Sequence, residues 1–203
     1  MMLNIINDKS PYYITFSMKN INAIINICKA EIVESKFDEM FTSIPLPLQS
    51  ADNIINLSPE LRKLKFTTKR MNLFVSQPGC YRPPHKDGAA MEFGINIPIE
   101  ILDDKCSTNW YTDISLEHYH LHQSTQFHNG SPRPRREIIN YNGNVTPAES
   151  MTLQSDECIL FNVNQYHDWD NTQSTNQRII LTLRPLLSNR LTFEDAARIL
   201  FSK

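Results

Sequence analysis

The chain has 203 residues, the usual length of one domain, and 40% of them are hydrophobic while 21% are charged. Its formal net charge of −2 provides no general positive field for nucleic acid and no acidic excess typical of a disordered chain. Only five glycines are present, and neither G-x-G-x-x-G nor G-x-x-x-x-G-K-[ST] occurs, which argues against the glycine-rich nucleotide-binding classes.

The cysteines and the hydropathy pattern predict the cellular location of the protein. Four widely spaced cysteines without a C-x-x-C pair argue against a zinc ribbon or a redox pair. The N-terminus does not resemble a signal peptide, and no stretch approaches 18 apolar residues. We therefore expect a soluble, cytoplasmic protein with reduced thiols and no membrane contact, and the sequence leaves its oligomeric state open.

The first 65 residues predict a helical N-terminal buttress. Apolar residues recur at three- and four-residue steps from Ser17 to Glu34, which indicates one helix. Two prolines make Ile44 to Leu48 an extended connector. Ser58 and Pro59 then predict the start of a short helix that ends near Lys65, because serine caps helices and proline suits the first turn.

Residues 66–187 predict a mainly β core. Short β-branched runs, separated by Pro, Gly and Asn, predict strands. These are Met71 to Val75, Phe93 to Ile99, Asn109 to Thr112, Ile138 to Tyr141, Cys158 to Val163 and Arg178 to Leu183. Such spacing is typical of a sandwich or barrel, and the segment from His122 to Arg136 is expected to be a mobile loop.

The last segment, 190–203, predicts a C-terminal helix from Phe193 to Phe201. Thr192 is its expected cap, and Asp195 completes a pair similar to a capping box. The whole chain, 1–203, is thus expected to form a single domain with a β core and flanking helices.

A candidate metal site begins at His85-Lys86-Asp87. In an extended segment, residues two apart point to the same side, so this imidazole and this carboxylate can bind one metal ion. His167, just after a predicted strand, is the natural third ligand. Two histidines and one carboxylate form the facial triad of non-haem Fe(II) oxygenases. Because H-x-D alone arises readily by chance, a loop histidine that makes a surface hydrogen bond is the competing interpretation.

A candidate anion site follows on the strand from Arg178 to Leu183. Arg178, Ile180, Thr182 and Arg184 would share one strand face. An arginine inside a β core is costly unless it meets an anion, and the planar guanidinium of Arg178 suits a carboxylate. Arg184 is either a second anion partner or a strand-end charge in water.

The ordered set His85-x-Asp87, His167 and Arg178 resembles the Fe(II)/2-oxoglutarate-dependent dioxygenase superfamily over residues 70 to 190. The run Phe93 to Ile99, with Cys106 and Trp110-Tyr111, is similar to small phage and bacterial oxygenases and to the aspartyl/asparaginyl β-hydroxylase-like branch. The ending Arg178 to Pro185 is also similar to that of AlkB-type nucleic-acid dealkylases, but Ile180 replaces their asparagine.

This resemblance implies a double-stranded β-helix, a jelly-roll or cupin-like fold, and a set of roles. His85, Asp87 and His167 would hold Fe(II), while Arg178, helped by Thr182, would bind the far carboxylate of 2-oxoglutarate. The cosubstrates would be 2-oxoglutarate and O2, with ascorbate as a possible stimulant. The expected reaction is hydroxylation of an amino-acid side chain, free or in a peptide. The presence of Asp87 favours hydroxylation over halogenation.

Further residues have two open interpretations each. Asn96 either donates to 2-oxoglutarate from the barrel lumen or satisfies a neighbouring strand. The expected substrate contacts at the mouth, Tyr81, Arg82, Trp110 and Trp169, are the kinds of residue that also serve as core filler.

Two alternatives to this function remain open. The first is an oxygenase of the same superfamily that acts on a nucleic acid or on another small molecule; for a nucleic acid, Arg133, Arg135 and Arg136 would form a local basic patch. In a non-catalytic β-barrel, His85 and Asp87 would be structural or would bind a redox-silent metal. Separately, His118, His120 and His122 form a second group that is able to bind Zn or Fe. Solvated side chains are the competing interpretation of both sets.

Overall fold

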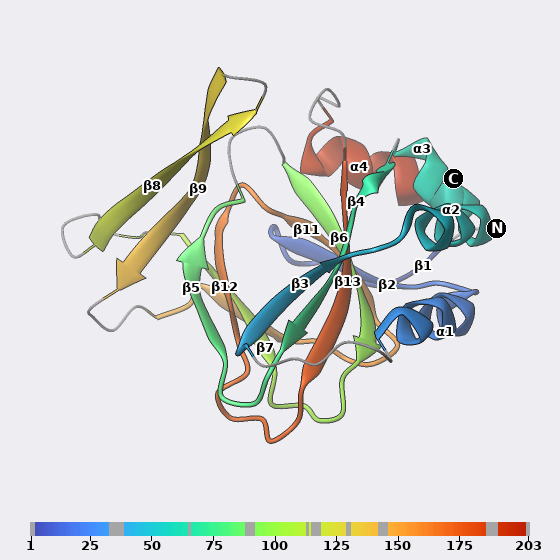
Figure 1. Cartoon of the computed structure of the whole chain (residues 1–203), viewed down its shortest axis with the longest axis horizontal. Helices are drawn as coiled ribbons and strands as arrows, with labels where there is room; N and C mark the ends of the chain where they lie inside the picture. Colours follow the sequence, from blue (N-terminus) through green and yellow to red (C-terminus); the bar gives the residue numbers. More distant parts are fainter. Residues whose placement is uncertain are drawn as a thin grey trace.

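The structure is a computed structural model of the chain (Figure 1). It describes residues 3–32, 39–64, 66–87, 92–112, 114, 119–128, 131–141, 146–185 and 191–201. For residues 67–69 and 119–141 the description covers the backbone. Two antiparallel sheets form the centre of the molecule, and the helices gather on one side of it (Figure 1). The prediction of a mainly β fold with flanking helices is confirmed.

The first sheet has seven strands, and β13 lies near its middle. In spatial order they are β1 (Asn4–Asn7), β2 (Tyr13–Ser17), β11 (Cys158–Asn162), β6 (Phe93–Glu100), β13 (Arg178–Pro185), β4 (Phe66–Ser76) and β3 (Phe41–Pro45). The crossovers between non-consecutive neighbours are those of a jelly roll rather than of a simple meander.

The second sheet has six strands and carries the predicted H-x-D segment. In spatial order they are β10 (Glu149–Thr152), β7 (Ser107–Tyr111), β12 (Tyr166–Asp170), β5 (Tyr81–His85), β9 (Ser131–Tyr141) and β8 (Tyr119–His128). Strand β5 pairs with β9 at a single position, His85 with Ile138. Pro83 and Pro84 explain this short pairing, because neither residue has a backbone N–H to donate.

Strand β13 shows how the sequence divides the interior of the protein. Ile179, Leu181 and Leu183 are buried in the core between the seven-stranded sheet and the helices. The alternate residues, among them Arg178 and Thr182, point to the other face, toward the second sheet. Strands β4, β6 and β11 alternate in the same way, so one face of this sheet is aliphatic and the other is partly polar.

Four helices cover the aliphatic face. They are α1 (Ile21–Ile32), α2 (Leu48–Leu57), α3 (Pro59–Lys63) and α4 (Phe193–Phe201). The predicted capping box of α4 is confirmed: the Asp195 N–H donates to Thr192 Oγ1, and the Thr192 N–H donates to Asp195 Oδ2. Ser58 precedes α3 as predicted, but its side chain makes no capping bond. None of the described helices is long and apolar enough to cross a membrane.

Two expectations about secondary structure are wrong. The first 65 residues form strands β1, β2 and β3 as well as helices, and all three join the seven-stranded sheet. The segment from His122 to Arg136 belongs to a hairpin of β8 and β9, which projects away from the helices (Figure 1). Gly130-Ser131-Pro132 suggested a loop, but residues 119–128 and 131–141 pair as antiparallel strands, with His128 opposite Ser131; Gly130 itself lies outside the described residues.

The aliphatic core predicts how the fold responds to truncation. Leu73 on β4 is fully buried, whereas Leu102 is 64% exposed. We expect Leu73→Ala to lower the free energy of unfolding by about 2–5 kcal/mol, because it removes buried methyl groups and leaves a cavity. Leu102→Ala, the same chemical change at the surface, should cost less than about 0.5 kcal/mol. Urea unfolding followed by circular dichroism measures both, and equal losses would contradict the assigned core.

Candidate metal centre

The two histidines of the predicted triad face each other across neighbouring strands. His85 ends β5 and His167 lies in β12, where the two residues are register partners. Their ring centroids are 4.6 Å apart. Asp87 follows β5, and its backbone N–H donates to the Val163 carbonyl oxygen. Candidate ligand atoms of the three residues lie within 4.8 Å of one another, and all three side chains are buried.

Backbone carbonyls orient both imidazoles. Nδ1 of His85 lies 2.8 Å from the Pro83 carbonyl oxygen, and Nδ1 of His167 lies 2.9 Å from the Gln165 carbonyl oxygen. An N–H at each Nδ1 donates to its carbonyl, so each Nε2 keeps a lone pair for a metal. Burial, reinforced by the neighbouring His167, holds the pKa of His85 well below its usual value. The imidazole of His85 is therefore neutral at pH 7, the form that binds metal.

Asp87 is held by a second interaction that the sequence left undecided. Its Oδ2 lies 2.7 Å from Nη2 of Arg184, whose side chain is 13% exposed. The Oδ1 atom lies 3.8 Å from Nε2 of His85, on the side that faces the histidines of the triad. Arg184 is therefore an anion partner inside the fold rather than a strand-end charge in water. The ion pair directs one carboxylate oxygen toward the histidines.

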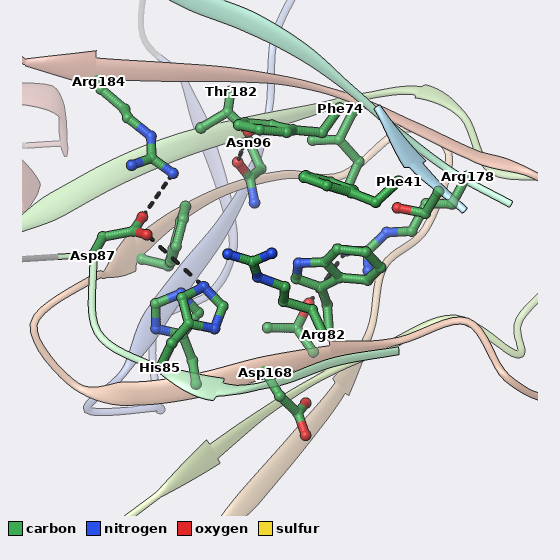
Figure 2. Close-up of a pocket in the computed structure, with 16 residues that line it drawn as sticks. Phe41, Phe74, Arg82, His85, Asp87, Asn96, Asp168, Arg178, Thr182 and Arg184 are labelled. Carbon is green, nitrogen blue, oxygen red and sulfur yellow. Dashed lines mark hydrogen bonds and ion pairs between the residues drawn. The ribbon is translucent and has the colours of Figure 1, made fainter. Parts of the chain in front are cut away.

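The triad opens into a cavity between the two sheets, and part of this cavity is open to solvent. Figure 2 shows His85 and Asp87 at one end of this cavity and Arg178 at the other. Asn96, Thr182 and Arg82 lie between these ends in the same view. The cavity thus joins a candidate metal centre to a candidate anion site.

Arg178 is the most deeply buried cation of the cavity, with 2% of its surface exposed. Its guanidinium donates to Thr108 Oγ1 (3.2 Å) and to the Ser107 carbonyl oxygen (3.5 Å), and its buried Nε has no partner. No ion pair joins it to a carboxylate in the part of the chain that the structure describes. Burial lowers its pKa to about 10, so it stays charged at neutral pH. A buried charge in this state calls for an anionic ligand.

Asn96 and Thr182 line the cavity between its two ends, as their strand positions predicted. They are register partners on β6 and β13, and Thr182 Oγ1 donates to Asn96 Oδ1 over 2.7 Å. The Asn96 amide nitrogen points into the cavity (Figure 2). Asn96 therefore bonds to a neighbouring strand, and its amide nitrogen remains at the cavity; its contact with 2-oxoglutarate stays a prediction.

The four expected substrate contacts divide into two pairs. Arg82 and Trp169 line the cavity. Tyr81 does not; its hydroxyl donates to Asp168, and its ring is 43% exposed. Trp110 is fully buried and stacks on Tyr13 with ring centroids 4.7 Å apart. The prediction that Trp110 lies at the mouth is wrong, because a strand from the N-terminal segment covers it.

Asp168 follows His167 in the chain, and it was not among the predicted site residues. Its carboxylate points away from the cavity (Figure 2) and accepts hydrogen bonds from Tyr81, Tyr111 and Asn109. Burial raises its pKa, and these three hydrogen bonds partly offset the rise. The network joins β12 to β5 and β7, the strands on either side of it. It therefore fixes the strand that carries His167.

The structure does not describe the side chains of the two alternative residue sets, the three histidines and the three arginines. His118 is outside the described residues, and His120 and His122 lie on β8, where the description covers the backbone. Arg133, Arg135 and Arg136 lie on β9, where the same limit applies. Their expected roles stay predictions.

Comparison with known proteins shows the fold. No protein-family profile matches the chain, and no curated protein matches it in sequence. An oxidoreductase of the 2OG-Fe(II) oxygenase family from Burkholderia pseudomallei matches with a TM-score of 0.53 at 10% identity, over 93% of this chain and 96% of that chain. The epimerase SnoN, solved with Fe3+, alpha ketoglutarate and nogalamycin RO, matches with a TM-score of 0.51 at 9% identity, over 85% of this chain and 77% of that chain.

The chain has the fold of the 2OG-Fe(II) oxygenases. The residues at its cavity fit that chemistry on two counts. Two imidazoles and one carboxylate are a donor set suited to Fe(II), and they leave coordination positions open. The buried Arg178 fits a dicarboxylate cosubstrate, because its charge lacks a carboxylate partner in the described chain.

Removal of a ligand tests the metal centre. We expect His167→Ala to raise the Kd for Mn(II), a stable substitute for Fe(II), by more than about 100-fold. Loss of a residue that only orients a ligand costs up to about 100-fold in metal affinity, and loss of the ligand itself should cost more. Isothermal titration of the apoprotein measures this change. His120→Ala is the control, and it should leave the affinity unchanged. Loss of binding in His120→Ala with retention in His167→Ala would move the metal site to the hairpin.

The Arg184–Asp87 ion pair predicts a positioning effect. Arg184→Met keeps most of the apolar stem but leaves the Asp87 carboxylate without its cation. We expect the Kd for Mn(II) to rise by about 10- to 100-fold, because the carboxylate is no longer held toward the histidines. Arg184→Lys should restore part of the affinity. An unchanged Kd in a folded Arg184→Met protein would show that the pair does not orient the ligand.

Proposed function

We propose that the protein is an Fe(II)- and 2-oxoglutarate-dependent oxygenase that hydroxylates an unactivated C–H bond of an amino-acid side chain, free or in a peptide. The observation that carries this proposal is the cavity itself. A buried His-Asp-His group lies at one end of it, and at the other end lies a buried guanidinium that has no carboxylate partner among the described residues.

The proposed reaction balances as substrate R–H, O2 and 2-oxoglutarate giving R–OH, succinate and CO2. Iron bound by His85, Asp87 and His167 supplies the activation of O2, and the protein supplies binding and orientation. Arg178 binds the far carboxylate of 2-oxoglutarate through its planar guanidinium. This contact holds one end of the cosubstrate, so that its other end extends toward the metal ligands.

The other cavity residues orient ligands and exclude water. Asn96 offers an amide donor between the two ends of the cavity, and Thr182 holds that amide in place. Phe161 and Ile180 line the cavity with apolar surface, which limits the access of water to the reacting atoms. Arg82 and Trp169 are the residues of the expected mouth that remain as substrate contacts. The four cysteines are free and buried, which supports the proposed cytoplasmic location.

Succinate formation tests the proposal directly. The purified protein with Fe(II), 2-oxoglutarate and ascorbate should convert 2-oxoglutarate to succinate, slowly without substrate and faster when amino acids are added. Arg178→Gln should raise the KM for 2-oxoglutarate at least about 30-fold, since it removes one partner of a buried charge pair. Arg198→Gln, a change at an exposed arginine on α4, is the control and should leave KM unchanged.

Two results would contradict the proposal. One is the absence of succinate from a wild-type protein that binds Fe(II) normally. The other is an equal KM for 2-oxoglutarate in the wild type and Arg178→Gln, which would separate the buried guanidinium from the cosubstrate.

A further inference from the structure

Arg82 is a cation in the cavity whose ligand the proposed function leaves open. It lies on β5, three residues before His85, and its register partner on β12 is Trp169. Its side chain is half-buried and lines the cavity, and Figure 2 shows its guanidinium in the middle of the space. It makes no hydrogen bond or ion pair with any residue that the structure describes.

The charges of the described cavity residues do not neutralise one another. Three guanidiniums line the cavity, and Arg184 is paired with Asp87. The second acidic residue, Asp168, points away and already accepts hydrogen bonds from Tyr81, Tyr111 and Asn109. Arg178 and Arg82 are therefore left without a carboxylate among the described residues. Under the proposed function 2-oxoglutarate supplies one for Arg178, and Arg82 remains available for a second anion.

An aromatic wall lies beside the Arg82 guanidinium. We define this wall as Phe41, Phe74 and Trp169, all of which line the cavity. The rings of Phe41 and Phe74 are stacked with centroids 5.4 Å apart, and Trp169 lies 5.2 Å from Phe41. The Arg82 guanidinium lies 5.6 Å from the centre of the Phe41 ring. A cation against an aromatic face is stabilised by it, but the outward N–H groups of the guanidinium still require acceptors.

We propose that the substrate is a small organic molecule with an oxyanion group, carboxylate or phosphate, which Arg82 binds while the apolar part lies against the aromatic wall. This inference rests on the proposed function and narrows its substrate class. A free amino acid has an α-carboxylate for Arg82, which a residue inside a peptide lacks. The free acid is therefore the favoured form of the substrate.

Three probes with one shared ring test this inference: phenylacetate, phenyl phosphate and the neutral phenylacetamide. Binding to the protein loaded with Mn(II) and 2-oxoglutarate, under argon, is measured by isothermal titration, so no turnover is needed. We expect at least one of the two anions to bind at least about tenfold more tightly than phenylacetamide, because a charge-assisted pair forms with Arg82. The tighter anion identifies the carboxylate or the phosphate class.

Arg82 variants show whether this residue is the source of the preference. Arg82→Gln should remove the advantage of the anions over phenylacetamide and change the affinity for 2-oxoglutarate by less than about twofold. Arg82→Lys should retain part of the advantage, since it keeps the charge and loses the planar geometry. Arg62→Gln, at an exposed position on α3, is the matched control and should bind all three probes as the wild type does.

Three outcomes would overturn the inference. They are equal binding of the three probes, binding of none of them, and a loss of 2-oxoglutarate affinity in Arg82→Gln as large as in Arg178→Gln. The last outcome would assign Arg82 to the cosubstrate. Failure of the proposed function has a different signature, because the wild type with Mn(II) would then not bind 2-oxoglutarate before any probe is added.

Discussion

A buried guanidinium on a strand of the central sheet is the constraint on which the cavity depends. Helices cover one face of that sheet, so β13 must turn Ile179, Leu181 and Leu183 toward them. The period of two then places Arg178 inside the fold, between the sheets. A charge in that place is stable only with acceptors around it, and the described chain supplies a hydroxyl and a carbonyl but no carboxylate. The interior of the fold thus contains a buried cation that has no carboxylate partner among the described residues.

Features that depend on local pattern could be predicted from the sequence. The alternation of β6 and β13 showed which side chains face the lumen, and it placed Asn96, Arg178 and Thr182 correctly. The spacing of His85 and Asp87 gave two candidate ligands on one side of an extended segment, and His167 proved to be their neighbour across the strand pair. The α4 capping box was equally local. In each case a few consecutive residues contain the physical information.

Features that depend on residues far apart in the chain could not be predicted from the sequence. Nothing near Arg184 indicates that Asp87, almost a hundred residues earlier, lies within ion-pair distance. Nothing in the sequence around Trp110 indicates that Tyr13, on strand β2, stacks on it. Strand β12, Tyr-His-Asp-Trp-Asp, lacks apolar alternation because His167 on one face belongs to the candidate metal centre and Asp168 on the other belongs to a hydrogen-bond network. Sheet pairing also overrode the loop signal of Pro132, which pairs with Phe127 in the β8–β9 ladder.

The central claim is that one cavity holds a metal at its histidine end and a dicarboxylate at its arginine end. A crystal structure of the protein grown anaerobically with Fe(II) and 2-oxoglutarate, with anomalous data at the iron edge, tests both ends at once. The account predicts one anomalous peak bound by Nε2 of His85, Nε2 of His167 and the Asp87 carboxylate, with a 2-oxoglutarate carboxylate on Arg178. Iron at any other residues, or an Arg178 guanidinium without a carboxylate, would contradict it.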